Sequence, residues 1–187
     1  MTKFTIHTAE SAPEESKPLV AKSVAANGRL PGLHAVMAEA PGLLAAYQNV
    51  HQQFVESSLD KDEMTVVWQT INVENECHYC VPAHTGIAKM MKVDDAITEA
   101  LRDETPLPTA HLEALRTFTL QIVRDRGNVS DTDVQTFLDA GYTQRHILEV
   151  ILGYSQKIMS NYVNHLAQTP VDSVFEKFAW TRTDKAA

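Results

Sequence analysis

Apolar residues in this chain recur at spacings of three and four, and prolines and glycines interrupt the pattern where one helix would give way to the next. That spacing places apolar side chains on one face of an α-helix. The clearest stripe lies in segment 41–58 and consists of Leu43, Leu44, Tyr47, Val50, His51 and Phe54. Helices are also expected over 77–92, 94–104, 108–127, 130–141 and 143–168, and no segment predicts a hairpin. The sequence predicts an all-α fold.

Helix boundaries can be placed from capping residues. Asp60 followed by Glu63 matches an N-terminal capping box for a helix that runs to about residue 75. Part of this helix, TVVWQTIN, is rich in β-branched residues and resembles a strand locally, but the cap and the length favour a helix. Gly127, Gly141 and Pro170 are typical of helix ends.

The chain divides into three parts. Residues 1–30 are polar and mixed, which indicates a loosely ordered arm that leads into the fold. Residues 31–170 form the helical domain. Residues 171–187 form a short tail with an apolar patch, expected to pack on the body or on a neighbouring subunit. The patch consists of Val171, Val174, Phe175 and Phe178.

The net charge of the chain argues against binding to nucleic acids. The 187 residues include 24 acids and 16 bases, for a net charge of −8, and an acidic chain repels phosphates. Segment 130–152 has the rhythm of a helix-turn-helix, but only Arg145 and Lys157 lie near its would-be recognition face. We therefore expect no nucleic-acid partner. With no run of 18 apolar residues and no apolar leader, we expect a cytoplasmic protein without membrane contact.

The segment CHYCVPAH holds both cysteines of the chain, Cys77 and Cys80, followed by His84. On a helix of about 100° per residue, these three side chains share one face. The positive end of the helix stabilises a thiolate, and a histidine one turn later can exchange a proton. This set favours a reversible dithiol–disulfide couple. A permanent disulfide is uncommon in a reducing cytosol.

Other interpretations of the cysteine pair remain open at this point. Zinc usually needs four ligands, and the sequence has no second cysteine or histidine pair, although folding could bring His165 or a carboxylate to the site. Two buried, inert cysteines are also possible. A thioredoxin fold requires a βαβ context that is missing here. We expect no metal and no organic cofactor.

The motif resembles a known family. ENECHYCVPAHTGIAKM is similar to the Cys-x-x-Cys-x-x-x-His signature of the alkyl hydroperoxidase D (AhpD)-like branch of the carboxymuconolactone decarboxylase family. GRLPGLHAVMAEAPGLLAAY and AGYTQRHILEVILGYSQKIMSNYVNH resemble its lead-in and closing helices. The resemblance implies an AhpD-like helical bundle with the CxxC pair at the N-terminus of a core helix. It also implies a homo-oligomer and a thiol-dependent peroxidase.

The resemblance assigns roles to individual residues. Cys77 and Cys80 match the redox pair that reduces hydroperoxides, and His84 matches the histidine that transfers protons. An unidentified thiol or disulfide reductant would then regenerate the dithiol. Two positions depart from the family: Thr65 stands where a glutamate is common, twelve residues before the first cysteine, and Tyr79 replaces a histidine.

Glu74 is the acid that we expect to replace the missing glutamate. It ends the preceding helix, three residues before Cys77, and a carboxylate there could orient His84 through a water. Two alternatives to the peroxidase are carried forward. A decarboxylase would need a basic cluster near the motif, which the sequence does not reveal, and a non-catalytic helical oligomer would keep only a vestigial dithiol.

Overall fold

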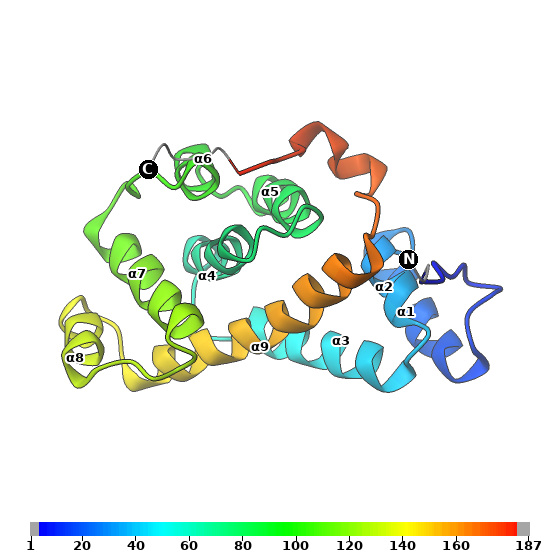
Figure 1. Cartoon of the computed structure of the whole chain (residues 1–187), viewed down its shortest axis with the longest axis horizontal. Coiled ribbons are helices and arrows are strands. Elements are labelled where there is room, and N and C mark those ends of the chain that lie inside the picture. Colours follow the sequence, from blue (N-terminus) through cyan, green and yellow to red (C-terminus); the bar gives the residue numbers. More distant parts are fainter. Residues whose placement is uncertain (1–3, 183–187) are drawn as a thin grey trace.

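The computed structural model describes residues 4–182, and the regular secondary structure in this range is entirely helical (Figure 1). The predicted all-α fold is confirmed. Segment 65–72, which resembled a strand locally, is helical. In chain order the helices are η1 (Glu14–Ser16), α1 (Lys17–Asn27), α2 (Gly32–Met37), α3 (Pro41–Val55), α4 (Lys61–Glu74), α5 (Cys80–Met90), α6 (Asp95–Asp103), α7 (Ala110–Arg124), α8 (Asp131–Asp139), α9 (Gln144–Ala167) and η2 (Ser173–Phe178).

Helix α4 forms the centre of the fold. Every residue from Met64 to Val73 is buried, and the helix contacts α5, α6, α7 and α9 (Figure 1). A helix that is buried on all sides needs small or apolar side chains, or polar side chains with partners. Its β-branched residues therefore contribute to the core, with Val66, Val67 and Ile71 fully buried.

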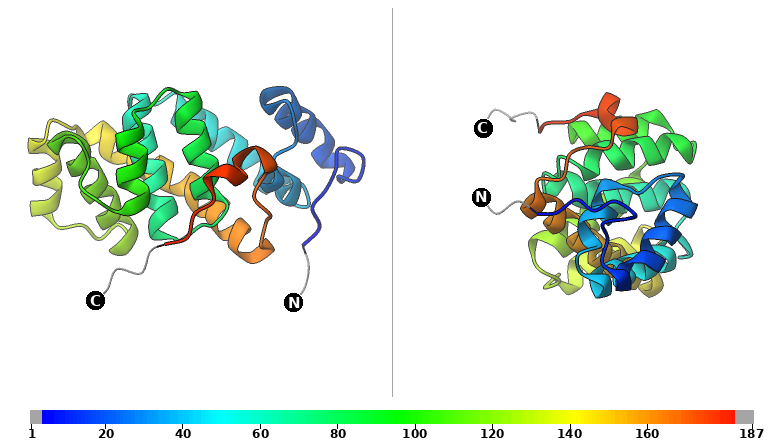
Figure 2. Two further views of the ribbon diagram at one scale, coloured as in Figure 1. Left: turned by 90° about the horizontal axis from the view of Figure 1, so that it is seen from above. Right: turned by 90° about the vertical axis from the view of Figure 1, so that its right-hand side faces the viewer.

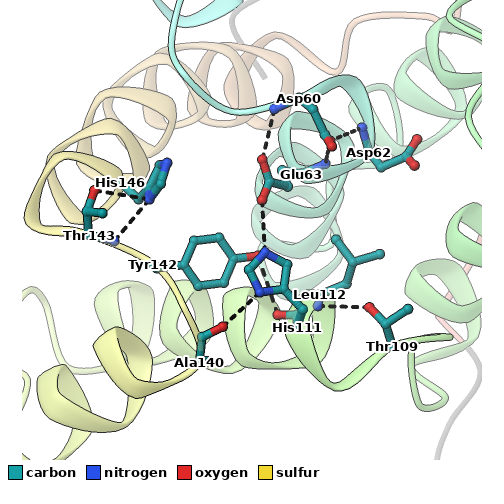
Figure 3. Close-up of polar contacts among 10 residues, drawn as sticks. All are labelled: Asp60, Asp62, Glu63, Thr109, His111, Leu112, Ala140, Tyr142, Thr143 and His146. Atoms are coloured by element: carbon teal, nitrogen blue, oxygen red, sulfur yellow. Dashed lines mark hydrogen bonds and ion pairs between the residues drawn. The ribbon is translucent and has the colours of Figure 1, made fainter.

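A network of polar contacts holds the first turn of α4 in place (Figure 3). The Asp60 carboxylate accepts hydrogen bonds from the backbone N–H groups of Asp62 and Glu63. The Glu63 carboxylate in turn accepts a hydrogen bond from the Asp60 N–H. The other Glu63 oxygen lies 3.2 Å from Nε2 of His111, at the start of α7. Tyr142, just before α9, stacks on His111 with ring centroids 4.1 Å apart. The predicted capping box thus also joins α4 to α7 and α9.

Helix α9 crosses the molecule beneath α4 and beside α3 (Figure 1). Gly153 allows the close approach: a Cβ at this position would lie 2.6 Å from the Phe54 ring and 2.9 Å from Val67. Both of those side chains are fully buried. The absence of a side chain at Gly153 therefore lets α3, α4 and α9 meet in one core.

The N-terminal arm is more ordered than the sequence indicated. Residues 17–27 form α1, and Val20 is 1% exposed against the body. The sequence analysis missed this helix because it lacks a clear apolar stripe and is held by only a few buried residues. Residues 1–3 of the expected arm lie outside the described residues.

The C-terminal tail crosses α5 (Figure 2). Phe175 of η2 packs against Gly86 of α5, at a place where a Cβ would collide with the ring. Arg102 donates hydrogen bonds to the carbonyl oxygens of Phe178 and Ala179, which holds the end of η2. Residues 183–187 of the expected tail lie outside the described residues. Within 4–182, no helix combines the length and apolarity that a membrane span requires.

Substituting Gly153 by alanine should destabilise the protein by about 1–3 kcal/mol, because the new methyl group overpacks the Phe54 ring. Urea unfolding followed by circular dichroism measures the change. Gly42→Ala is the matched control, since a Cβ there meets nothing within 4 Å in helix α3. Equal stability of the Gly153 and Gly42 variants would contradict the close approach.

Self-association remains a prediction, and α9 carries the surface that would support it. Four exposed apolar residues lie along this helix: Leu148, Ile151, Tyr162 and Leu166. We expect light scattering to give a mass above the 20.8 kDa of one chain, and Leu148→Glu with Leu166→Glu to lower it. Thr132→Glu on exposed α8 should leave the mass unchanged. A monomeric wild type at micromolar concentration would refute the prediction.

Candidate functional site

The two cysteines lie at the start of α5. Cys80 is the first residue of the helix, whereas Cys77 lies in the turn that connects α4 to α5. The helix therefore starts three residues later than we expected, because the chain must reverse direction and Glu76 adopts a left-handed φ of 50°. The Cys80 N–H donates to the Cys77 sulfur at 3.2 Å. Both thiols are free and buried, and the pair stands at the N-terminus of a core helix as predicted.

A buried lysine lies beside the cysteines. Lys157 of α9 is 1% exposed, and its Nζ lies 2.8 Å from Nε2 of His84 on α5. An ammonium group only donates hydrogen bonds, so Nε2 of His84 is the acceptor and a neutral ring carries its hydrogen on Nδ1. Nδ1 is buried without a partner among the described residues.

Burial and nearby charge set the ionisation of this group. Burial lowers the pKa of His84 well below its ordinary value, and the Lys157 ammonium adds to the effect. Burial also lowers the pKa of Lys157, opposed by the charge of the two cysteines. Among the residues that the structure describes, the opposite charges that act on Lys157 are those of the cysteines and not of a carboxylate. An isolated buried ammonium is costly, so a thiolate is the counterion that the site offers.

The two cysteines differ in their acidity. Burial raises the pKa of Cys80, but the Cys77 thiol and the Lys157 ammonium outweigh it, so the pKa of Cys80 lies below its ordinary value. The Asn164 amide donates to the Cys80 sulfur at 3.3 Å and acts in the same direction. Burial raises the pKa of Cys77, and the neighbouring Cys80 raises it further. Cys80 is therefore the more acidic of the two thiols.

Buried amides hold the helices around the cysteines. Asn161 of α9 donates to Asn72 of α4 at 3.0 Å, and Asn72 donates to Gln69 one turn earlier. Gln69 in turn donates to the Val81 carbonyl and to the Thr85 hydroxyl of α5. The network links all three helices, and a satisfied polar network restricts a core to one arrangement.

A cavity of about 490 Å³ opens onto Cys80, His84 and Lys157. Its walls come from α1, α2, α3, α5, α9 and η2, so the N-terminal arm and the tail both help to enclose it. The apolar and aromatic part of the wall consists of Ala26, Pro31, Leu33, Tyr47, Tyr79, Ala83, Ile87, Met90 and Phe175. Only Cys80 of the two cysteines lines the cavity, so a ligand meets Cys80 first.

Glu74 does not approach His84 in this arrangement. Its carboxylate forms two hydrogen bonds with Arg124 of α7, at 2.7 and 2.8 Å, and it does not line the cavity. The structure thus pairs Glu74 with Arg124, and the link to His84 through a water stays a prediction. Thr65 is buried and donates to the Lys61 carbonyl at 2.8 Å. Lys157 is the ionisable group that partners the histidine.

The sequence analysis missed Lys157 and Asn164 as site residues. It placed Lys157 on an exposed helix face, although the side chain is fully buried. One signal was available: Gly153, Lys157, Ser160 and Asn164 recur at spacings of four, three and four, and all are buried. Small and polar residues on one stripe of a long helix indicate a face that packs closely on others.

The described residues show no cluster of side chains that would bind a metal ion. No group of three or more histidine, cysteine, aspartate or glutamate side chains in residues 4–182 is arranged to hold a metal ion. His165, the residue considered as a further ligand, has no shown contact with either cysteine. Asn164, its neighbour on α9, is the residue that contacts the Cys80 sulfur.

Solved structures share this fold. An AhpD-core, peroxidase-related protein from Ralstonia eutropha JMP134 superposes with a TM-score of 0.80 and 15% identity, over 94% of this chain and 96% of that chain. A peroxidase-related protein from Silicibacter sp. TM1040 gives 0.76 and 19%, over 93% and 95%. A variant of the debrominase Bmp8 in complex with 2,3,4-tribromopyrrole gives 0.78 and 14%, over 95% of both chains.

No family model and no curated protein matches the sequence. The structural likeness nevertheless confirms the expected AhpD-like fold. At these identities the likeness establishes the fold, and the chemistry has to be argued from the residues of this chain.

Removing the Lys157 charge should raise the pKa of Cys80, because burial would no longer be offset by the ammonium. In a Cys77→Ser background, alkylation of Cys80 by iodoacetamide should show a midpoint below the ordinary thiol value of about 8.5. Lys157→Met should move this midpoint upward by about one pH unit or more. Lys89→Met, which removes a surface lysine paired with Asp95, is the control. An unmoved midpoint in Lys157→Met would refute the ion pair.

Proposed function

We propose that this chain, which has the AhpD-core fold, is a thiol-dependent peroxidase that reduces organic hydroperoxides through the Cys77–Cys80 couple. Cys80 is the attacking thiolate and Cys77 the resolving thiol. His84 and Lys157 supply and hold the proton that the leaving group requires. Lys157 takes the place that we had assigned to Glu74 in the proton path.

The observation that carries this proposal is the buried Lys157 ammonium. Its shown hydrogen-bond partner is a neutral histidine, and the opposing charges that act on it are those of the cysteines. A thiolate is a far better nucleophile than a thiol. A site that keeps Cys80 ionised beside a proton donor, at the wall of a cavity, has the parts that peroxide reduction needs.

In the first step, the Cys80 thiolate attacks the terminal oxygen of ROOH. The S–O bond forms as the O–O bond breaks, and the alkoxide takes a proton from the Lys157 ammonium. Cys80 becomes a sulfenic acid, and the alcohol ROH leaves the cavity. His84 accepts a hydrogen bond from Lys157, so it holds the amine in place and can share the proton.

In the second step, the Cys77 sulfur attacks the sulfenic acid of Cys80. The disulfide forms, and the hydroxyl group leaves as water with the proton of Cys77. An external dithiol then reduces the disulfide by exchange and restores both thiols. The proton gained at Cys80 returns to the Lys157 amine, which regenerates the ion pair. The reductant has to be small or extended, because both sulfurs are buried.

Reductive removal of a halogen is a second candidate. The debrominase Bmp8 has the same fold, and the cavity here is lined by the rings of His34, Tyr47 and His51. In such a reaction the Cys80 thiolate would take the bromine of an aryl bromide while the ring carbon takes a proton. Cys77 would then displace bromide and form the same disulfide.

Single substitutions should separate the roles of the two cysteines. After treatment with cumene hydroperoxide, Cys77→Ser should accumulate one sulfenic acid that dimedone traps at Cys80, because the resolving thiol is gone. Cys80→Ser should show no adduct. Mass spectrometry of the wild type should show the loss of two hydrogens, reversed by dithiothreitol. Two free thiols that persist in the wild type after peroxide treatment would exclude the peroxidase.

His84→Ala should lower the peroxide-dependent rate at pH 7 by more than about tenfold, because it removes the partner that holds Lys157. The fall should appear in kcat more than in KM, and circular dichroism should confirm an intact fold. An unchanged rate would reduce His84 to a core residue. Release of bromide from a bromopyrrole without reduction of peroxides would favour the second candidate.

A further inference from the structure

We infer that the cavity in front of Cys80 selects substrates that carry a carboxylate at one end of an apolar body. For the reaction itself the inference rests on the proposed function, but binding of the carboxylate does not. Four observations support it: the charges that line the cavity, the hydrogen-bond partners of Asp172 beside Arg29, the hydrogen-bond donors in the wall, and the apolar side chains of the wall.

All the formally charged side chains that line the cavity are basic. Lys22, Arg29 and Lys157 line it, and no aspartate or glutamate does so among the described residues. This differs from the chain as a whole, where acids outnumber bases by 24 to 16. A cavity with charges of one sign and walls of low polarity concentrates ligands of the opposite sign.

Asp172, the acid that contacts Arg29, already has other partners. Asp172 accepts hydrogen bonds from the Tyr79 hydroxyl at 2.7 Å and from the Gly32 N–H at 3.0 Å. Its contact with Arg29 is long, at 3.5 Å. Arg29 also lies over the Phe175 ring, 5.3 Å from its centroid, which keeps the guanidinium at the cavity wall. A ligand carboxylate can therefore compete for Arg29.

Lys22 is the second base available to a ligand. It is exposed on α1 at the mouth of the cavity, and no hydrogen bond or ion pair with another described residue holds it. Lys157 is different, because it lies at the buried end beside Cys80 and His84. The cavity thus has a basic mouth and a reactive inner end, which suits a ligand with an anion at one end and a hydroperoxide further along.

A chain of hydrogen bonds that ends at His51 leaves the N–H of this neutral ring as a donor for a ligand. The Trp68 indole N–H donates to Oε1 of Gln156, which leaves the Gln156 amide nitrogen to donate to Nδ1 of His51. Burial lowers the pKa of His51 to about 4, so the ring is neutral at pH 7. A neutral ring that accepts at Nδ1 carries its hydrogen on Nε2. No described residue accepts from that N–H, so an oxygen atom in the cavity can.

The remainder of the wall favours an apolar body. Leu33, Ile87, Met90 and Phe175 line the cavity, and about 490 Å³ is within the range of sites for small organic ligands. Hydrogen peroxide would fill little of this space. A medium-chain acid that carries a hydroperoxide fits the charges, the donors and the volume together.

The first experiment measures binding without any reaction. Isothermal titration calorimetry compares octanoate with 1-octanol on the reduced wild-type protein. We expect octanoate to bind at least about tenfold more tightly at low salt, and the difference to shrink in about 0.5 M NaCl, where charges are screened beyond a few ångströms. Equal affinities for the acid and the alcohol would overturn the inference.

Variants of the two basic residues at the mouth of the cavity test whether they cause the preference for octanoate. Lys22→Gln and Arg29→Gln together should weaken octanoate by about tenfold, since each exposed ion pair contributes a few-fold, and should leave 1-octanol unchanged. Lys17→Gln is the matched control: it removes a lysine of the same helix that pairs with Glu14 and does not line the cavity. An equal loss of octanoate binding in the control would attribute the preference to net charge and would also overturn the inference.

The second experiment separates this inference from the proposed function. It compares kcat/KM for the hydroperoxide of a medium-chain fatty acid with that of its methyl ester, using dithiothreitol as reductant. We expect the acid to be preferred by at least about tenfold, and the preference to fall in the double variant. If neither compound is reduced but octanoate still binds, the peroxidase fails and the ligand class stands. If both are reduced equally well, the peroxidase stands and the selectivity fails.

Discussion

The charge of Lys157 is the constraint around which the site is organised. An ammonium group inside a helical core is tolerated only where an anion or strong acceptors compensate for its lost hydration. Here the acceptor is His84, and the opposite charge that most raises the pKa of the lysine is that of Cys80. The lysine therefore lowers the pKa of Cys80 against the effect of burial, whereas the pKa of Cys77 is raised, so the two cysteines of one short motif differ.

The fold keeps this ion pair in place from three directions. Helix α5 carries Cys80 and His84, helix α9 carries Lys157 and Asn164, and α4 lies between them at the centre of the core. Gly153 lets α9 approach α4 and α3 closely, one turn before Lys157. Loosening the core at Gly153 should therefore disturb the chemistry as well as the stability.

The sequence predicted most helices but only part of the candidate site. The capping residue Asp60 marked a helix start that the structure confirms, because a cap is a local signal. The CxxC pair and His84 could be found for the same reason. Lys157 lies 73 residues from His84 and resembles an ordinary surface lysine. Its role depends on tertiary packing, as does the ion pair of Glu74 with Arg124.

The C-terminal location of α9 and η2 has a consequence for biosynthesis. The cysteines are made near the middle of the chain, whereas Lys157, Asn164 and the Phe175 that packs on Gly86 come later. Until α9 has been translated, both thiols are without the helix that carries Lys157 and Asn164. The pKa difference between the two cysteines therefore arises only after α9 has left the ribosome and packed near α5.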